Sequence, residues 1–246
     1  MNSIITVKDV SKSFVIEGKQ KLSVLHNINL EIATGEFFMI LGPSGSGKST
    51  LLRVMSGLEP DYQGNVHYGE GITRADISFV FQEFAIFPWL TVFENIALGL
   101  RARHTPEHIV KKVVERELER FNLTNFSHAF PRELSGGMKQ RIGIARALAT
   151  DPKVIFMDEP FSELDSFTAD DLRKEFLRIW KETHQTIVMV THLIGEAIEL
   201  ADRIAVFTPR PGKIEKIITN PLSHPCNKRS EEFFHLEDEL YALIRP

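Results

Sequence analysis

The residues best suited to chemistry lie in a glycine-rich stretch near the start of the chain. The stretch has the pattern G-x-x-x-x-G-K-S, which is typical of a phosphate-binding loop. Its glycines let successive N–H groups turn towards phosphate oxygens. Lys48 can reach the β- and γ-phosphates, and the Ser49 hydroxyl can ligate Mg²⁺. The loop consists of Gly42, Pro43, Ser44, Gly45, Ser46, Gly47, Lys48, Ser49 and Thr50.

The flanking segments supply the structural context that this pattern needs. Residues 36–41 are mostly apolar and predict a buried strand, and residues 51–57 predict a helix that ends at a glycine. A helix that starts at the loop adds the positive end of its dipole to the phosphate site. The alternative, a ligand-free turn rich in glycine and serine, leaves this order of elements unexplained. The pattern alone does not separate kinases, GTPases and transport ATPases.

Two adjacent acids follow a second buried strand. Residues 154–157 are apolar, and Asp158 and Glu159 come directly after them. Because α/β sheets bind ligands at the carboxyl ends of their strands, Asp158 is placed to hold Mg²⁺. Glu159 is placed to act as general base towards an attacking water. The alternative is an acid pair that caps a helix or faces solvent.

A serine and two glycines begin a predicted helix over residues 136–148. Ser135, Gly136 and Gly137 offer a hydroxyl, several N–H groups and a positive helix end, which together suit a second phosphate group. Two glycines weaken a helix, so a role beyond helix formation is indicated. The alternative is an ordinary N-cap followed by flexible glycines.

The other elements predict an α/β fold. In the first third of the chain, strands whose apolar and polar residues alternate indicate antiparallel pairs. A helical insert follows. In the second half, strands alternate with helices along the chain, which favours a parallel sheet covered on both faces. In the last helix we expect Phe233, Phe234, Leu240 and Leu243 to pack against the protein. The predicted strands are 4–14, 24–32, 65–68, 77–81, 186–190, 204–207 and the edge strand 213–218, with a loop over 15–23; the predicted helices are 92–100, 106–121, 167–183, 193–201 and 230–244.

Composition narrows the classes of protein. The 246 residues are 43% hydrophobic and 25% charged, which suits one sizeable core. A net charge of -4 gives no support to nucleic-acid binding. Cys226 is the single cysteine, so an internal disulfide is excluded and a reducing compartment is favoured. No signal peptide or membrane span is recognisable, so we expect a cytoplasmic protein that meets a membrane only through a partner.

The ordered motifs resemble the ATP-binding-cassette (ABC) ATPases over nearly the whole chain. The resemblance rests on the phosphate loop, the stretch LSGGMKQR and the strand VIFMDEP. It implies further site residues at matching positions: Gln82 as the Q-loop glutamine, Asp165 in the D-loop, His192 as the switch histidine and Phe14 as the aromatic that stacks on adenine.

The resemblance also implies an architecture and a mode of action. The fold would be a P-loop NTPase (RecA-like) core with an antiparallel β subdomain and an inserted α-helical subdomain at about 86–150. The ABC domain would span 1–220, and a linker and helix would follow at 221–246. Two copies would pair head to tail, with ATP between the phosphate loop of one and Ser135 to Gly137 of the other. Ser49, Gln82 and Asp158 would hold Mg²⁺, and Gln82 would also contact the attacking water. His192 would contact the γ-phosphate, and Asp165 would contact the opposite copy.

Two further stretches, residues 87–100 and 191–214, look like importer ATPases of the nitrate, sulfonate and taurine group. That group implies integral membrane permeases on the inner face of the cell membrane and an extracytoplasmic substrate-binding protein. Glu163 in the D-loop and the lack of an arginine after Thr168 depart from the commoner pattern, and would suit a related importer, for example of a pyrimidine precursor. A non-transport ABC ATPase and an exporter ATPase stay open as alternatives. A metabolic kinase would leave His192 and the stretch LSGGMKQR, here called the signature, unexplained.

An apolar cluster follows Gln82. It consists of Phe84, Ile86, Phe87, Trp89 and Leu90. Such a cluster can receive a short helix of a membrane subunit, or it can form the small core of the helical insert. The sequence does not choose between these two roles.

Overall fold

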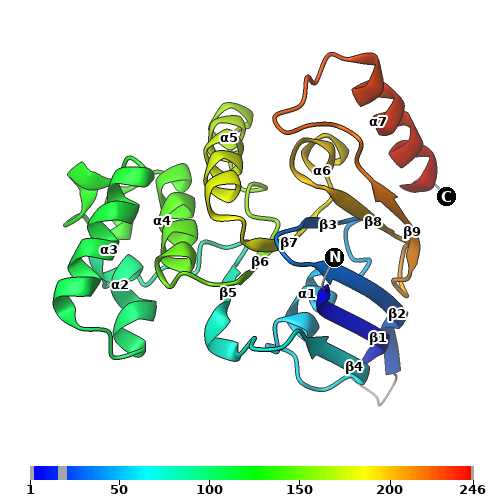
Figure 1. Cartoon of the computed structure of the whole chain (residues 1–246), viewed down its shortest axis with the longest axis horizontal. Helices are drawn as coiled ribbons and strands as arrows, with labels where there is room; N and C mark the ends of the chain where they lie inside the picture. Colours follow the sequence, from blue (N-terminus) through cyan, green and yellow to red (C-terminus); the bar gives the residue numbers. More distant parts are fainter. Residues whose placement is uncertain (1–2, 16–20, 245–246) are drawn as a thin grey trace. The chain divides into compact units, whose positions relative to one another are not determined.

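The computed structural model describes residues 3–15 and 21–244, so residues 16–20 of the expected loop lie outside the described part. The chain forms two compact units (Figure 1). The first unit contains Met1–Arg74 and Leu177–Pro246, and the second contains Ala75–Phe176. The expected division into 1–220 and 221–246 stays a prediction, and its outermost residues 1, 2, 245 and 246 lie outside the described residues.

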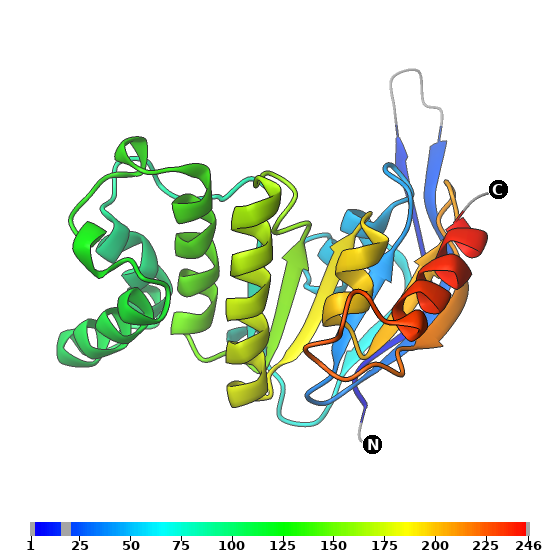
Figure 2. The same cartoon turned by 90° about the horizontal axis from the view of Figure 1, so that it is seen from above.

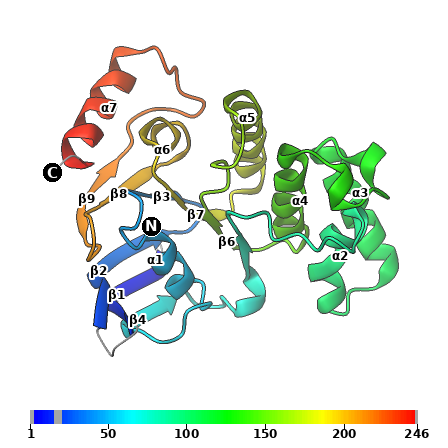
Figure 3. The ribbon, with the colours of Figure 1, turned by 180° about the vertical axis from the view of Figure 1, so that it is seen from behind.

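The first unit contains the expected antiparallel sheet. Its strands β1 (Ser3–Val15), β2 (Lys21–Ala33) and β4 (Gln63–Tyr68) lie in the order β2-β1-β4 (Figure 3). Val7 lies opposite Leu30 on one side and Val66 on the other. Alternate residues of β1, such as Ile5 and Val7, are buried, as period-2 patterning requires.

A mainly parallel sheet forms the core of the first unit. Strand β3 (Phe37–Leu41) is buried along its whole length and lies between the parallel strands β7 (Thr186–Thr191) and β8 (Arg203–Phe207). Strand β9 (Ile214–Thr219) runs antiparallel to β8, as expected for an edge strand. Helix α1 (Lys48–Met55) packs against β7, and α6 (Ile194–Leu200) packs against β3.

The final helix α7 (Glu231–Ile244) packs against α6 and β8. Phe233 and Leu240 are buried as expected, but the prediction for Phe234 was wrong because its side chain is 52% exposed. Leu236 is buried in its place. Residues 233, 236 and 240 share one helix face, whereas residue 234 is turned about 100° away from residue 233.

The second unit contains a parallel strand pair and the helical insert. Strand β5 (Ile77–Val80) pairs with β6 (Val154–Asp158). Helix α2 (Val92–Ala102) packs against both α3 (Glu107–Arg120) and α4 (Gly136–Ala149), the green group in Figure 2. Helix α2 begins with a capping box, in which Thr91 and Glu94 satisfy each other's backbone N–H groups. Helix α5 (Ser166–Thr183) runs from this unit into the first.

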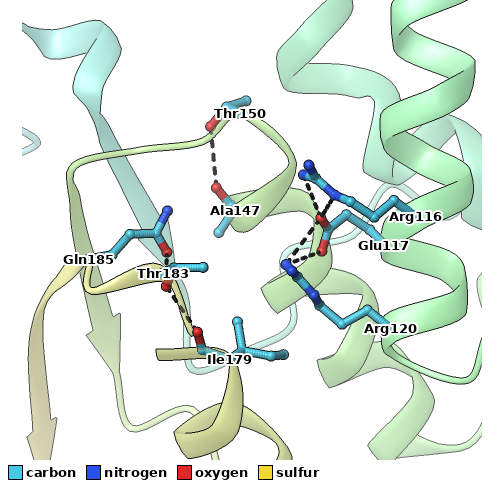
Figure 4. Close-up of polar contacts among 8 residues, drawn as sticks. All are labelled: Arg116, Glu117, Arg120, Ala147, Thr150, Ile179, Thr183 and Gln185. Carbon is cyan, nitrogen blue, oxygen red and sulfur yellow. Dashed lines mark hydrogen bonds and ion pairs between the residues drawn. The ribbon is translucent and has the colours of Figure 1, made fainter. Parts of the chain in front are cut away.

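Polar contacts stabilise helix α3 and the last turns of helices α4 and α5 (Figure 4). Glu117 of α3 is fully buried, and Arg116 and Arg120 neutralise it at 2.7 Å and 3.4 Å. The Thr150 hydroxyl donates to the carbonyl of Ala147 at the end of α4, shortly before β6.

In the first unit, the Thr183 hydroxyl donates to the carbonyl of Ile179 and lies 3.3 Å from Oε1 of Gln185, shortly before β7. A threonine hydroxyl thus satisfies a backbone carbonyl at the end of both α4 and α5, shortly before the strands that lead to the site residues. No helix within the described residues 3–15 and 21–244 combines the length and apolar character that a membrane span requires.

Candidate nucleotide-binding site

The phosphate loop joins β3 to α1, as the sequence predicts. Gly45 and Gly47 have positive φ values of 75° and 100°, which glycine adopts without strain. A β-carbon at Gly47 would lie 3.0 Å from the carbonyl oxygen of Val24, and one at Gly42 would lie 2.8 Å from Cβ of Phe207. The loop therefore requires glycine for its conformation and for its close approach to neighbouring strands.

The polar groups of the loop are suited to a polyanion. The Lys48 side chain is buried, and its ammonium donates to the carbonyls of Gly42 at 2.9 Å and Pro43 at 3.0 Å. The Ser46 hydroxyl is also buried and has no hydrogen-bond partner among the described residues. A buried cation, an unsatisfied hydroxyl and a helix N-terminus at one loop fit the phosphate groups of a nucleotide.

His192 lies beside this loop. Strands β3 and β7 are parallel with Leu41 opposite Thr191, and the N–H of Gly42 donates to the Thr191 carbonyl at 3.4 Å. The loop and His192 therefore leave the same edge of the sheet. The imidazole is exposed. The N–H of Leu193 donates to the Thr191 hydroxyl at 3.1 Å and fixes the chain just after the histidine.

Phe14 lies near the end of β1 and is 38% exposed. The Lys12 ammonium lies 4.7 Å from the centre of its ring, and Glu59 and Asp61 hold that ammonium at 3.0 Å and 3.3 Å. A cavity of about 510 Å³ adjoins this end of β1 and β2, and Lys12 lines it. Lys12 was not predicted to lie at this site, since nothing in the sequence distinguishes it from an exposed lysine.

In the second unit, two predicted site residues lie at the same edge of the sheet. Val80 of β5 lies opposite Met157 of β6, so Gln82 and Asp158 both come at the carboxyl ends of this parallel pair. Asp158 is buried. Glu159 has a positive φ of 42°, and both the N–H and the hydroxyl of Ser162 donate to its carbonyl, at 3.2 Å and 2.9 Å. A left-handed conformation at a non-glycine residue is strained and is enriched at functional sites.

The signature residues begin α4 as expected. The Ser135 hydroxyl caps the helix by accepting a hydrogen bond from the N–H of Met138 at 3.3 Å. Ser135 and Gly136 are exposed. A β-carbon at Gly137 would lie only 2.6 Å from Cγ2 of Thr168, so only glycine lets the start of α4 approach the start of α5 this closely.

Asp165 and Thr168 connect the D-loop to this contact. The Asp165 carboxylate accepts hydrogen bonds from the N–H groups of Phe167 and Thr168 at 3.2 Å and 3.1 Å, and so caps α5. Hydrogen bonds from the Thr168 side chain and backbone lower the pKa of Asp165 below its usual value. The carboxylate is therefore held ionised, next to the threonine that touches Gly137.

Helix α4 also holds the segment after Gln82. Arg146 donates to the carbonyl of Ala85 at 2.8 Å, and a β-carbon at Gly143 would lie 3.2 Å from the carbonyl oxygen of Phe84. This contact of Arg146 could not be predicted from local sequence, because its partner is 61 residues away in the chain. The second unit thus brings the Gln82 segment and the D-loop to one helix that begins with the signature.

The structure divides the expected site residues between the units. The first unit carries Phe14, the phosphate loop and His192, and the second carries Gln82, Ser135 to Gly137, Asp158, Glu159 and Asp165. Parallel strands with a glycine-rich loop between strand and helix define the P-loop class of nucleotide-binding proteins.

Comparisons with known proteins give the family. A model of the family described as "ABC transporter" matches residues 25–162. The chain is 44% identical over 241 residues to an aliphatic sulfonates import ATP-binding protein of Bacillus thuringiensis subsp. konkukian (strain 97-27), which covers 96% of this chain and 94% of the relative. It is 42% identical over 252 residues to a nitrate import ATP-binding protein of Synechocystis sp. (strain ATCC 27184 / PCC 6803 / Kazusa), covering 97% and 94%.

Solved structures agree. A dimeric ATP-binding cassette bound to ADP and Pi, in a post-hydrolysis state, superposes with a TM-score of 0.77 at 33% identity and covers 88% of this chain and 98% of its own. A Clostridium perfringens cassette described as part of an ABC transporter complex gives a TM-score of 0.77 at 27% identity, covering 90% of each chain. The chain belongs to the ABC transporter family. It is an ATPase, and the expected P-loop NTPase fold is confirmed.

Proposed function

We propose that this ATPase is the energy-supplying subunit of a membrane importer for a small solute. The solute class that fits best is that of nitrate, sulfonates and taurine, with a pyrimidine precursor as a related possibility. The observation that carries the proposal is the identity of 44% along nearly the full chain to a sulfonates import ATP-binding protein, together with 42% to a nitrate import protein. The transported solute itself would contact other subunits.

The active form would be a head-to-tail pair of identical chains. The chain has one phosphate loop and one signature, so a complete composite site needs a second cassette, most simply a second copy of this chain. The exposure of Ser135 and Gly136 leaves the signature accessible to that copy. The related cassette bound to ADP and Pi is dimeric. ATP would close the pair by binding both halves, and hydrolysis would release them.

Each predicted residue would have a defined role in that site. Phe14 would stack on adenine, and the loop 42–50 with Lys48 would bind the phosphates. Glu159 would take a proton from the attacking water as the water oxygen bonds to the γ-phosphorus. The bond from that phosphorus to the β,γ-bridging oxygen would break at the same time, and ADP would leave. His192 would contact the γ-phosphate.

The residues present also suit Mg²⁺. Ser49, Gln82 and Asp158 offer a hydroxyl, an amide oxygen and a carboxylate, which are hard oxygen ligands of the kind that Mg²⁺ accepts alongside phosphates. When bound, the ion would neutralise charge that develops on the phosphate oxygens.

Asp165 would lie at the contact with the opposite copy.

The permease would dock on the apolar cluster after Gln82. Trp89 is 69% exposed, and its ring lies edge-on to Phe87 with centroids 5.4 Å apart. An adjoining cavity of about 430 Å³ is lined by Phe84 and Ile86 together with charged side chains such as Arg132 and Lys139. These features suit a short amphipathic helix of a membrane subunit.

The test is recovery of partners from native membranes. A tagged chain should bring down a multi-span permease and an extracytoplasmic binding protein, because the permease links the chain to the inner face of the membrane. Trp89→Ala should reduce this recovery at least severalfold and leave ATP binding unchanged. Phe234→Ala, which removes a similarly exposed aromatic on α7, should not change it.

Three outcomes would contradict the proposal. Recovery of ribosomes or DNA-repair factors without a membrane subunit would remove the transport function while leaving the ATPase intact. A permease that moves its solute outward in vesicles would make the chain an exporter subunit. Equal loss of permease in the two aromatic variants would remove the docking surface from this cluster.

A further inference from the structure

A turn far away in the sequence lies directly against the phosphate loop. It follows β8 and contains Pro209, Arg210, Pro211 and Gly212. The N–H of Gly212 donates to the carbonyl of Val24 at 2.8 Å, and the N–H of His26 donates to the Gly212 carbonyl at 3.0 Å. A β-carbon at Gly212 would lie 2.2 Å from the carbonyl oxygen of Ser46. The turn is therefore hydrogen-bonded to β2 and packs against the backbone of the phosphate loop.

The turn is also tied within itself. The N–H of Thr208 donates to the Lys213 carbonyl at 3.0 Å, and the N–H of Lys213 donates to the Thr208 hydroxyl at 3.1 Å. The same hydroxyl lies 3.2 Å from the carbonyl of Pro209. These bonds join both ends of the turn, so Arg210 is held on a short, closed segment whose two prolines reduce its backbone freedom.

Arg210 contacts the phosphate loop at its left-handed glycine. Its Nε donates to the carbonyl of Gly45 at 3.2 Å, and a β-carbon at Gly45 would lie 3.3 Å from Nη2. Gly45 has a φ of 75°, a conformation that in such loops lets neighbouring N–H groups converge on an anion. The guanidinium thus holds the carbonyl of the residue on which this conformation depends.

We propose that Arg210 is a positioning residue of the nucleotide site. By bonding the Gly45 carbonyl it keeps that carbonyl away from the bound phosphates and holds the loop in its anion-binding conformation. Its permanent positive charge also favours a polyphosphate in the loop. Arg210 acts through Gly45 and contributes affinity for nucleotides that place phosphates in the loop. It takes no part in the chemical step.

The experiment compares three nucleotides and four proteins. The dissociation constants of ATP, ADP and AMP would be measured by calorimetry for wild type, Arg210→Ala, Arg210→Lys and Arg229→Ala. Arg229 is the matched control because its side chain is also exposed and no hydrogen bond or ion pair of that side chain is observed among the described residues. Steady-state hydrolysis would supply KM and kcat for each protein, and thermal unfolding would report on the fold.

We expect Arg210→Ala to weaken ATP and ADP binding roughly three- to tenfold. This is the contribution of one hydrogen bond from a charged donor. AMP binding should change less than twofold, KM should rise and kcat at saturation should stay within twofold of wild type. Arg210→Lys should bind ADP more tightly than Arg210→Ala, and Arg229→Ala should match wild type.

Any of three results would overturn the proposal. ATP and ADP affinities of Arg210→Ala within twofold of wild type would remove the role. Equal weakening of AMP and ADP would show a general loss of structure with no dependence on the phosphates. A lysine variant no better than the alanine variant would show that the positive charge at this position contributes nothing. Because the lysine variant retains the charge and most of the side chain, this comparison stands even if the alanine variant unfolds more easily.

Discussion

Gly137 provides a direct test of how the signature is positioned. A β-carbon at this residue would lie 2.6 Å from Cγ2 of Thr168, whereas non-bonded carbons prefer about 3.5–4.0 Å. Gly137→Ala must therefore displace Thr168, whose N–H donates to the Asp165 carboxylate at 3.1 Å. The substitution should disturb the signature and the D-loop together.

The size of the effect follows from two opposing terms. Overpacking by one methyl group costs about 1–3 kcal/mol, and the better helix propensity of alanine returns up to about 1 kcal/mol. We therefore expect a net loss of about 1–2 kcal/mol in the free energy of unfolding. Thr168→Ser removes the clashing methyl group and keeps the hydroxyl, so it should recover most of that loss in the double variant.

The assay is a double-mutant cycle read by denaturant unfolding and by ATP hydrolysis. Gly137→Ala should lower both stability and hydrolysis, and adding Thr168→Ser should restore both. Gly195→Ala is the matched control, since a β-carbon there meets no atom within 4 Å, and it should be neutral or stabilising. Wild-type stability of Gly137→Ala, or no recovery in the double variant, would refute the close contact between the signature and the start of α5.

Three other predictions concern catalysis, binding and pH. Glu159→Gln should bind ATP normally but hydrolyse it about two to four orders of magnitude more slowly, as expected when a general base is lost, and wild-type turnover would remove Glu159 from that role. Lys48→Ala should weaken ATP binding itself, and an unchanged dissociation constant by calorimetry would count against the phosphate-loop assignment. Hydrogen bonds from Thr91 hold the pKa of Glu94 below its usual 4.5, so the stability that they provide is complete above pH 4.5 and is lost as the pH falls through the lowered value. Glu94→Gln should therefore flatten the fall in unfolding free energy over that acid range, and an unaltered pH profile would contradict the capping box.

Local signals in the sequence predicted the elements that carry the site. The phosphate loop and the helix start at Ser135 each depend on residues within a few positions of one another, and the structure has both. The buried strands β3, β6 and β7 were recognisable because apolar runs of their length are typical of parallel sheets.

Contacts between distant segments could not be predicted in this way. Gly137 meets Thr168, and Arg210 meets Gly45 across 165 residues, yet neither pair has a local pattern that links it. The face of α7 was assigned with one error, because two adjacent phenylalanines leave the buried side ambiguous until a neighbouring helix selects it. The roles of the individual site residues stay predictions until they are tested.

The central claim is that two copies complete each other's ATP site through Ser135 to Gly137. The most direct measurement is the molar mass, by light scattering, of Glu159→Gln and of the double variant Glu159→Gln with Ser135→Arg, each with Mg²⁺ and ATP or ADP. We expect twice the chain mass of 28.0 kDa for the single variant with ATP only. We expect the monomer mass for the double variant, which should still bind ATP. A single variant that stays monomeric with ATP, or a double variant that still dimerises, would contradict the composite site.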